Sequence, residues 1–162
     1  MKKELFATLC LAFATQNPLI ASENTPKWLR WSSISPDGTT IAFSAFGDIY
    51  TVPVSGGKAQ AITTNTAYDY APVWSPDSKH LAFASAREGS LDVYVSSLSG
   101  GAPKRLTTHS GKEIPVAFSD NEHILFSTYL TPTAENMQFP SSLFSQLYQV
   151  SITGGRPKRF SD

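Results

Sequence analysis

The chain repeats one module three times, and the copies differ in length at a single joint. Each copy contains a turn of the Ser-Pro-Asp type, an apolar segment that ends in phenylalanine, a tyrosine, a Gly-Gly pair and a Thr or Ser. In each copy the first glycine comes 6 positions after the tyrosine, and the Thr or Ser comes 6 positions after the second glycine. The step from phenylalanine to tyrosine instead grows from 7 to 11 to 22 residues.

A repeat of about 40–50 residues made of short strands is typical of a β-propeller blade. The sequence therefore predicts an all-β chain: a partial β-propeller of three four-stranded antiparallel blades, half of a six-bladed ring. The expected blades cover about residues 28–64, 65–108 and 109–162. Propellers close with four to eight blades, so three blades leave two sheet faces exposed. We expect either a piece of a larger protein or a chain that completes a ring with a second copy.

Four strands are expected in each module, because β-branched and aromatic residues alternate between turn residues. Pro36 and Gly38 favour a tight turn after the first strand, since proline presets φ and glycine tolerates positive φ. The expected first strands are Ser32–Ser35, Pro72–Ser75 and Pro115–Ser119. The second are Thr40–Ser44, His80–Ser85 and His123–Thr128, the third Asp48–Val54, Asp92–Leu98 and Gln146–Ile152, and the fourth Ala59–Thr63, Lys104–Thr107 and Lys158–Ser161.

Residues 1–22 resemble a secretory signal peptide, which leaves 23–162 as the propeller segment. Lys2 and Lys3 precede an apolar run that is too short to span a bilayer, and small residues end the segment. The sequence thus predicts a secreted or periplasmic protein without a stable membrane anchor. The only cysteine, Cys10, lies in this run, so the mature chain would have neither a disulfide nor a thiol catalyst.

Charge excludes several classes of partner. The 13 basic and 13 acidic residues cancel, which argues against nucleic acid and anionic lipid as ligands. Basic residues recur at equivalent places in the second and third modules, where we interpret them as a solvated strand face. They are Lys104, Arg105, Arg156, Lys158 and Arg159.

The sequence shows no catalytic constellation. His80 and His123 occupy equivalent repeat positions, and His109 has no neighbouring nucleophile in the sequence. The Gly-Gly pairs fit hairpin turns better than a phosphate loop, which needs a following helix. No zinc, calcium or hydrolase motif is present. We therefore predict no catalytic residue, no metal and no cofactor.

Ligand contacts are expected on one rim of the array, where the loops vary in length. In an up-and-down blade, the loop between the second and third strands lies on the same rim as the connection to the next blade. The long segment Tyr129–Leu143 would then lie beside Asn65–Asp69 and Ser110–Glu113. That segment could be a passive surface loop or a contact loop for a peptide or protein. The candidate contact residues on this rim are Tyr68, Asp69, Tyr70, His109, Met137 and Phe139.

The ordered motifs Ser-Pro-Asp-Gly, Ile-Ala-Phe, Asp-Ile-Tyr and Gly-Gly resemble the PD40 (TolB-like) propeller repeat. The stretches Trp28–Trp31, Ala67–Trp74 and Phe139-Pro140 look more like the N-terminal propeller of tricorn-type serine peptidases, a resemblance that covers residues 27–162. It implies a non-catalytic segment that gates or channels peptides toward a peptidase core elsewhere, and it carries no catalytic residue onto this sequence. The alternative is a TolB-like periplasmic scaffold that binds proteins. A third possibility is a fragment without function.

Overall fold

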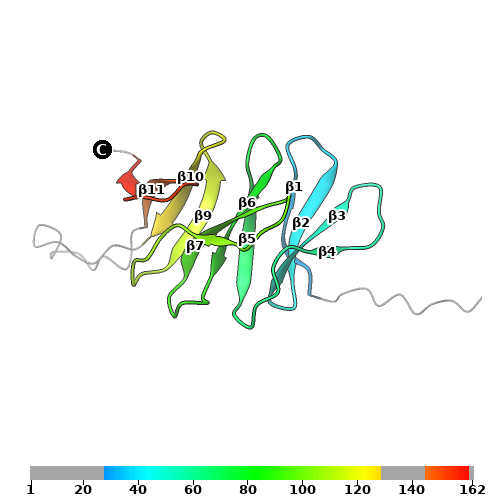
Figure 1. Ribbon diagram of the computed structural model, residues 1–162, viewed down its shortest axis with the longest axis horizontal. Helices are drawn as coiled ribbons and strands as arrows, with labels where there is room; N and C mark the ends of the chain where they lie inside the picture. Colours follow the sequence, from blue (N-terminus) through cyan, green and yellow to red (C-terminus); the bar gives the residue numbers. More distant parts are fainter. Residues whose placement is uncertain (1–27, 129–144, 161–162) are drawn as a thin grey trace, which may run out of the picture.

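Three separate four-stranded antiparallel sheets stand side by side along the long axis of the molecule (Figure 1). The structure is a computed structural model, and it describes residues 28–128 and 145–160. Within each sheet, the strands lie in the order in which they occur in the chain. The expected all-β architecture of four-stranded antiparallel blades is confirmed. No helix that could cross a membrane occurs in the described ranges.

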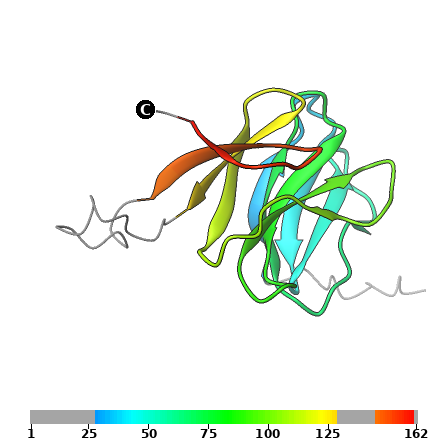
Figure 2. The ribbon, with the colours of Figure 1, turned by 60° about the vertical axis from the view of Figure 1, so that its left-hand side comes forward.

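The strands follow the repeat closely. Blade 1 contains β1 (Arg30–Ile34), β2 (Thr40–Ala45), β3 (Asp48–Pro53) and β4 (Gln60–Ala61). Blade 2 contains β5 (Asp69–Trp74), β6 (His80–Ser85), β7 (Asp92–Ser97) and β8 (Lys104–Arg105). Blade 3 contains β9 (Glu113–Phe118), β10 (His123–Thr128), β11 (Gln146–Ser151) and β12 (Lys158–Arg159). The innermost strands β1, β5 and β9 lie next to one another, whereas the outer strands diverge, so the sheets fan out (Figure 2).

The first strand of each blade begins two or three residues earlier than the sequence analysis placed it. The sequence predicts strands that start at Pro72 and Pro115, but β5 begins at Asp69 and β9 at Glu113. A β-bulge explains the difference, because the β5–β6 register shifts between Tyr70 and Val73 and Ala71 has a left-handed φ of 54°. A bulge adds one residue and lets pairing continue beyond it.

Tight turns on the rim opposite the long loops use one set of hydrogen bonds in blades 1 and 2. The Ser35 hydroxyl donates to Asp37 over 2.6 Å and accepts the Thr40 amide over 3.0 Å. Gly38 has a φ of 72°, as expected for the turn, and Ser78 takes the same conformation in blade 2 at 59°. We call this edge the turn rim and the opposite edge the loop rim.

Two apolar clusters join the three blades. Between blades 1 and 2, Ala42 and Ile49 pack against Phe83 and Tyr94. Between blades 2 and 3, a second cluster holds together side chains from both sheets, among them Val93, Ile124, Phe126 and Val150. Phe83 is fully buried, and burying a side chain of that size stabilises the fold by ~1.5–3 kcal/mol. The phenylalanine and tyrosine that recur in each module thus pack between the blades, as Phe83 and Tyr94 show.

Candidate functional site

A hollow of about 460 Å³ opens on the loop rim of blade 1. It lies where the β2–β3 hairpin meets the connection from blade 1 to blade 2. Exposed aromatic side chains border it, with exposed fractions of 64% for Trp28, 76% for Phe46 and 46% for Tyr68. Large apolar side chains exposed together mark an interaction site more often than a passive surface. The hollow is therefore the candidate functional site.

Phe46 is the residue that sequence reasoning missed. It forms the two-residue tip of the β2–β3 hairpin with Gly47, and both have positive φ, 53° and 94°. A hairpin tip of this type favours Asn-Gly, because asparagine tolerates the left-handed conformation far better than a bulky residue. A non-glycine residue loses about 1–2 kcal/mol there. The sequence feature that could have identified this exposed hairpin tip is the Phe46-Gly47 pair between two predicted strands.

The walls of the hollow are held by hydrogen bonds to Asp48, the first residue of β3. Its Oδ1 accepts the Thr63 hydroxyl over 3.1 Å and the Asn65 amide over 3.0 Å. Asn65 Oδ1 in turn accepts the Ala67 amide over 2.9 Å. The Asp69 amide donates to the Gly47 carbonyl over 2.7 Å, which ties the hairpin tip to blade 2. The loop that carries Tyr68 is thus a fixed surface.

A row of aromatic rings leads from the hollow toward the innermost strands. The ring centroid of Tyr68 lies 5.3 Å from that of Tyr70, and Tyr70 lies 5.7 Å from Trp31. Trp31 borders an apolar groove of about 240 Å³, which strands β1, β5 and β9 line with residues such as Val73 and Ile114. We call Tyr68, Tyr70 and Trp31 the aromatic row. Burial, and secondarily Tyr68, raises the pKa of Tyr70 above its ordinary value.

Two of the predicted contact residues, Tyr68 and Tyr70, lie in the aromatic row. The side chain of Asp69, between them in the chain, points into the interior. It is fully buried, and its Oδ2 accepts a hydrogen bond from Arg87 over 2.8 Å. The Arg87 guanidinium also lies over the Tyr94 ring, 4.6 Å from its centroid. The sequence predicts Asp69 as a contact residue on the rim, whereas the structure buries its side chain. Strand alternation explains the error, because β5 already begins at Asp69 and turns that side chain inward.

A second group of charged side chains lies where blade 2 meets blade 3 on the loop rim. Asp92 and Glu113 are both buried, and Asp92 pairs with Arg105 over 2.8 Å. Burial raises the pKa of Asp92 despite that pair. Burial also raises the pKa of Glu113, with a smaller contribution from Asp92, while Thr107 and His109 act against the increase. His109 thus lies near a buried carboxyl group, and its Nδ1 accepts the Gly111 amide over 3.0 Å.

Of the basic residues predicted to form a solvated strand face, Lys104, Arg156, Lys158 and Arg159 are exposed, whereas Arg105 is partly buried. Arg105 holds the buried Asp92 and donates to the Thr107 carbonyl over 2.8 Å. Lys104 donates to the Thr153 carbonyl of blade 3 over 2.6 Å. Arg105 therefore links β8 to the buried start of β7, and Lys104 links blade 2 to blade 3. Met137 and Phe139, the other predicted contacts, lie outside the described residues.

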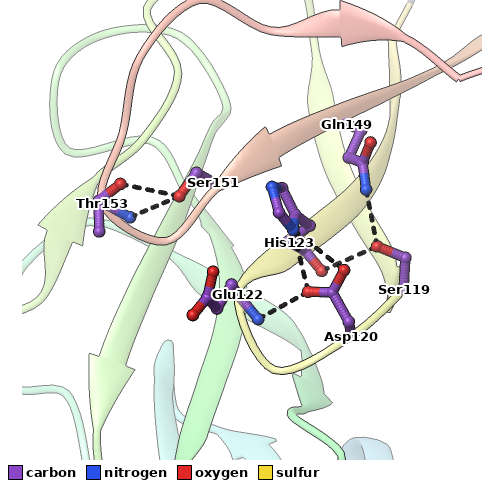
Figure 3. Close-up of polar contacts among 7 residues, drawn as sticks. All are labelled: Ser119, Asp120, Glu122, His123, Gln149, Ser151 and Thr153. Carbon is purple, nitrogen blue, oxygen red and sulfur yellow. Dashed lines mark hydrogen bonds and ion pairs between the residues drawn. The ribbon is translucent and has the colours of Figure 1, made fainter.

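Serine, histidine and aspartate come together on the turn rim of blade 3, but not as a catalytic triad (Figure 3). The His123 ring lies 3.0 Å from both carboxylate oxygens of Asp120. The Ser119 hydroxyl, however, donates to the His123 backbone carbonyl and accepts from Gln149 over 2.8 Å. A triad needs the serine hydroxyl on the imidazole. The cluster closes a turn, and the Glu122 amide is the main cause that lowers the pKa of Asp120.

Across residues 28–128 and 145–160, no three His, Cys, Asp or Glu side chains are grouped so that they could hold a metal ion.

Comparison with known proteins assigns the family. Residues 26–162 match the model of the tricorn protease N-terminal β-propeller domain. The chain belongs to this family. The propeller segment is 33% identical over 107 residues to a tricorn protease homolog of Streptomyces coelicolor, covering 64% of this chain and 10% of that protein. It is 30% identical over 135 residues to an uncharacterised protein of Agrobacterium fabrum, covering 80% and 42%.

Solved structures show the same fold. A putative TolB from Agrobacterium tumefaciens superposes with a TM-score of 0.64 at 29% identity, covering 81% of this chain and 45% of that one. The tricorn protease superposes with a TM-score of 0.57 at 16% identity, covering 76% of this chain and 13% of that one. The propeller segment therefore spans less than half the length of these relatives.

Proposed function

We propose that the propeller segment belongs to an exported tricorn-like serine peptidase and binds peptides on its loop rim, so that they are guided toward a peptidase core elsewhere. The segment itself performs no chemistry in this proposal. Its family supports the assignment, and so does the secretory leader expected at residues 1–22. The periplasm is the compartment we propose.

The observation that carries the proposal is the exposed aromatic surface around the hollow. Phe46 occupies a hairpin position that strongly favours Asn or Gly, and it exposes most of its surface there. Backbone strain that packing does not require is most often retained for function. The aromatic row continues this surface toward the groove between the innermost strands, which gives an extended peptide a continuous apolar path.

Peptide binding is tested with the purified chain and a fluorescein-labelled tryptic digest of casein. We expect saturable binding that weakens in Phe46→Ser and Tyr68→Ser variants, measured by fluorescence anisotropy. The digest should stay uncut during incubation. Cleavage that a single Ser→Ala substitution abolishes would contradict the non-catalytic role, and absence of binding would refute the proposed function.

A TolB-like protein scaffold is the second candidate. The putative TolB from Agrobacterium tumefaciens favours it, because the propeller segment covers 45% of that chain but only 10% of the tricorn homolog. A scaffold should capture a folded envelope protein and ignore denatured peptides. The casein digest therefore separates the two candidates, since only the peptidase accessory role predicts that it binds.

A further inference from the structure

Among the described residues that line the hollow, Arg30 is the only charged one. It begins β1 and pairs with Ser44 of β2, next to the hairpin that carries Phe46. Its guanidinium carbon lies 5.7 Å from the centroid of the exposed Trp28 ring. The remaining lining residues are aromatic, small or uncharged polar. The hollow thus combines one positive charge with a largely apolar wall.

Acidic groups near the hollow are already engaged. Asp69 is bound to Arg87, and Asp48 accepts the hydrogen bonds that hold the 63–67 loop. Within the ranges that the structure describes, Arg30 has no carboxylate within the 4.0 Å that defines an ion pair. Its planar fork of N–H donors is suited to a carboxylate, which it can bind through two parallel hydrogen bonds.

The shape of the site favours a chain that passes through it over one that ends in it. The hollow is open at the rim, and from Tyr68 the aromatic row continues to Trp31 and the groove between β1, β5 and β9. A peptide that follows this row extends beyond Arg30 in both directions. A carboxylate that reaches Arg30 then comes from a side chain.

We propose that the hollow recognises an extended peptide in which an acidic side chain adjoins an apolar one, with Arg30 binding the carboxylate and Phe46, Trp28 and Tyr68 contacting the apolar side chain. This inference rests on the proposed function and names the class of peptide that the site prefers. Charge complementarity supports this inference, because the acidic side chain supplies the negative charge that the described lining of the hollow lacks.

The test uses three fluorescein-labelled synthetic peptides in a Gly-Ser background. One contains Glu-Phe with both ends blocked, the second Gln-Phe with both ends blocked, and the third Gln-Phe with a free C-terminal carboxylate. We expect the purified chain to bind the Glu-Phe peptide about 10-fold more tightly than blocked Gln-Phe, a difference of about 1.4 kcal/mol, because only the carboxylate can form the charge-assisted pair with Arg30.

Arg30→Gln should remove that preference, and Arg30→Lys should keep part of it, since lysine retains the charge without the fork. Arg156→Gln removes the same charge at another exposed position and should change nothing. Equal affinities for the Glu and Gln peptides, or a preference that survives Arg30→Gln, would overturn the inference while leaving peptide binding intact. So would tight binding of Gln-Phe only when its C-terminus is free. If the chain binds neither these peptides nor the casein digest, the proposed function fails as well.

Discussion

Blades 1 and 2 differ at two equivalent rim positions, where only blade 2 has an ion pair. In blade 2 the first residue of the innermost strand is Asp69, and the residue two places after the second strand is Arg87, which binds it over 2.8 Å. By strand register the corresponding residues of blade 1 are Leu29 and Gly47, which cannot form an ion pair, and the exposed Arg30 and Phe46 lie next to them in the chain. The ion pair between Asp69 and Arg87 closes the loop rim of blade 2, whereas the loop rim of blade 1 has an open hollow. The repeat thus supplies the scaffold, and exchanges at a few rim positions decide which blade can bind.

Breaking the Asp69–Arg87 ion pair of blade 2 should have the largest effect on the free energy of unfolding. Arg87→Met leaves the fully buried Asp69 carboxylate without its partner, and removing one member of a buried pair destabilises a protein by about 3–5 kcal/mol. Urea unfolding followed by circular dichroism measures the change. Arg30→Met, which removes an exposed arginine from the rim of blade 1, should shift the free energy of unfolding by no more than about 0.5 kcal/mol. A similar loss in both variants would contradict the contrast between the blades.

Relieving the hairpin tip of blade 1 should have a smaller effect of opposite sign. Phe46→Asn places a residue that tolerates the left-handed conformation at a φ of 53°, and we expect a gain of roughly 1 kcal/mol in the free energy of unfolding. The same variant should bind the casein digest more weakly, because the aromatic wall is lost. A variant that becomes less stable would show that Phe46 is retained for folding.

The pH dependence of stability should distinguish the two rims. Burial raises the pKa of Glu113 on the loop rim above its ordinary 4.5, so the folded state holds this proton more tightly than the unfolded chain. Its contribution is present below pH 4.5 and is lost as the pH rises through the folded-state pKa. Glu113→Gln should therefore reduce the loss of stability on raising the pH from about 4.5. An unchanged profile in urea unfolding at several pH values would exclude this role.

On the turn rim the sign is reversed. Hydrogen bonds from Ser35 and Thr39 lower the pKa of Asp37, and those from Ser75 and Lys79 lower that of Asp77. Their contribution is present above pH 3.8 and is lost as the pH falls through the folded-state values. Asp37→Asn should thus reduce the loss of stability as the pH falls below 3.8. Glu113→Gln should leave that loss unchanged.

Spacing in the sequence was sufficient to predict the blades, because the Phe, Tyr and Gly-Gly positions fix the two middle strands and the outer turn. It was insufficient for the innermost strands, where the bulge at Ala71 adds a residue that alternation does not reveal. The site was predicted in part. Tyr68 and Tyr70 were identified from their place on the rim, but Arg30 and Phe46 become neighbours only through the β1–β2 pairing and the hairpin, and the partner of Asp69 lies 18 residues away.

Hydrogen–deuterium exchange of the purified chain, with and without the blocked Glu-Phe peptide, tests the central claim most directly. The open rim of blade 1 should gain protection at residues 45–48 and 65–68, while the sealed rim of blade 2 at residues 86–91 stays unchanged. Protection confined to residues 86–91, or to the turn rim at residues 119–123, would contradict the account.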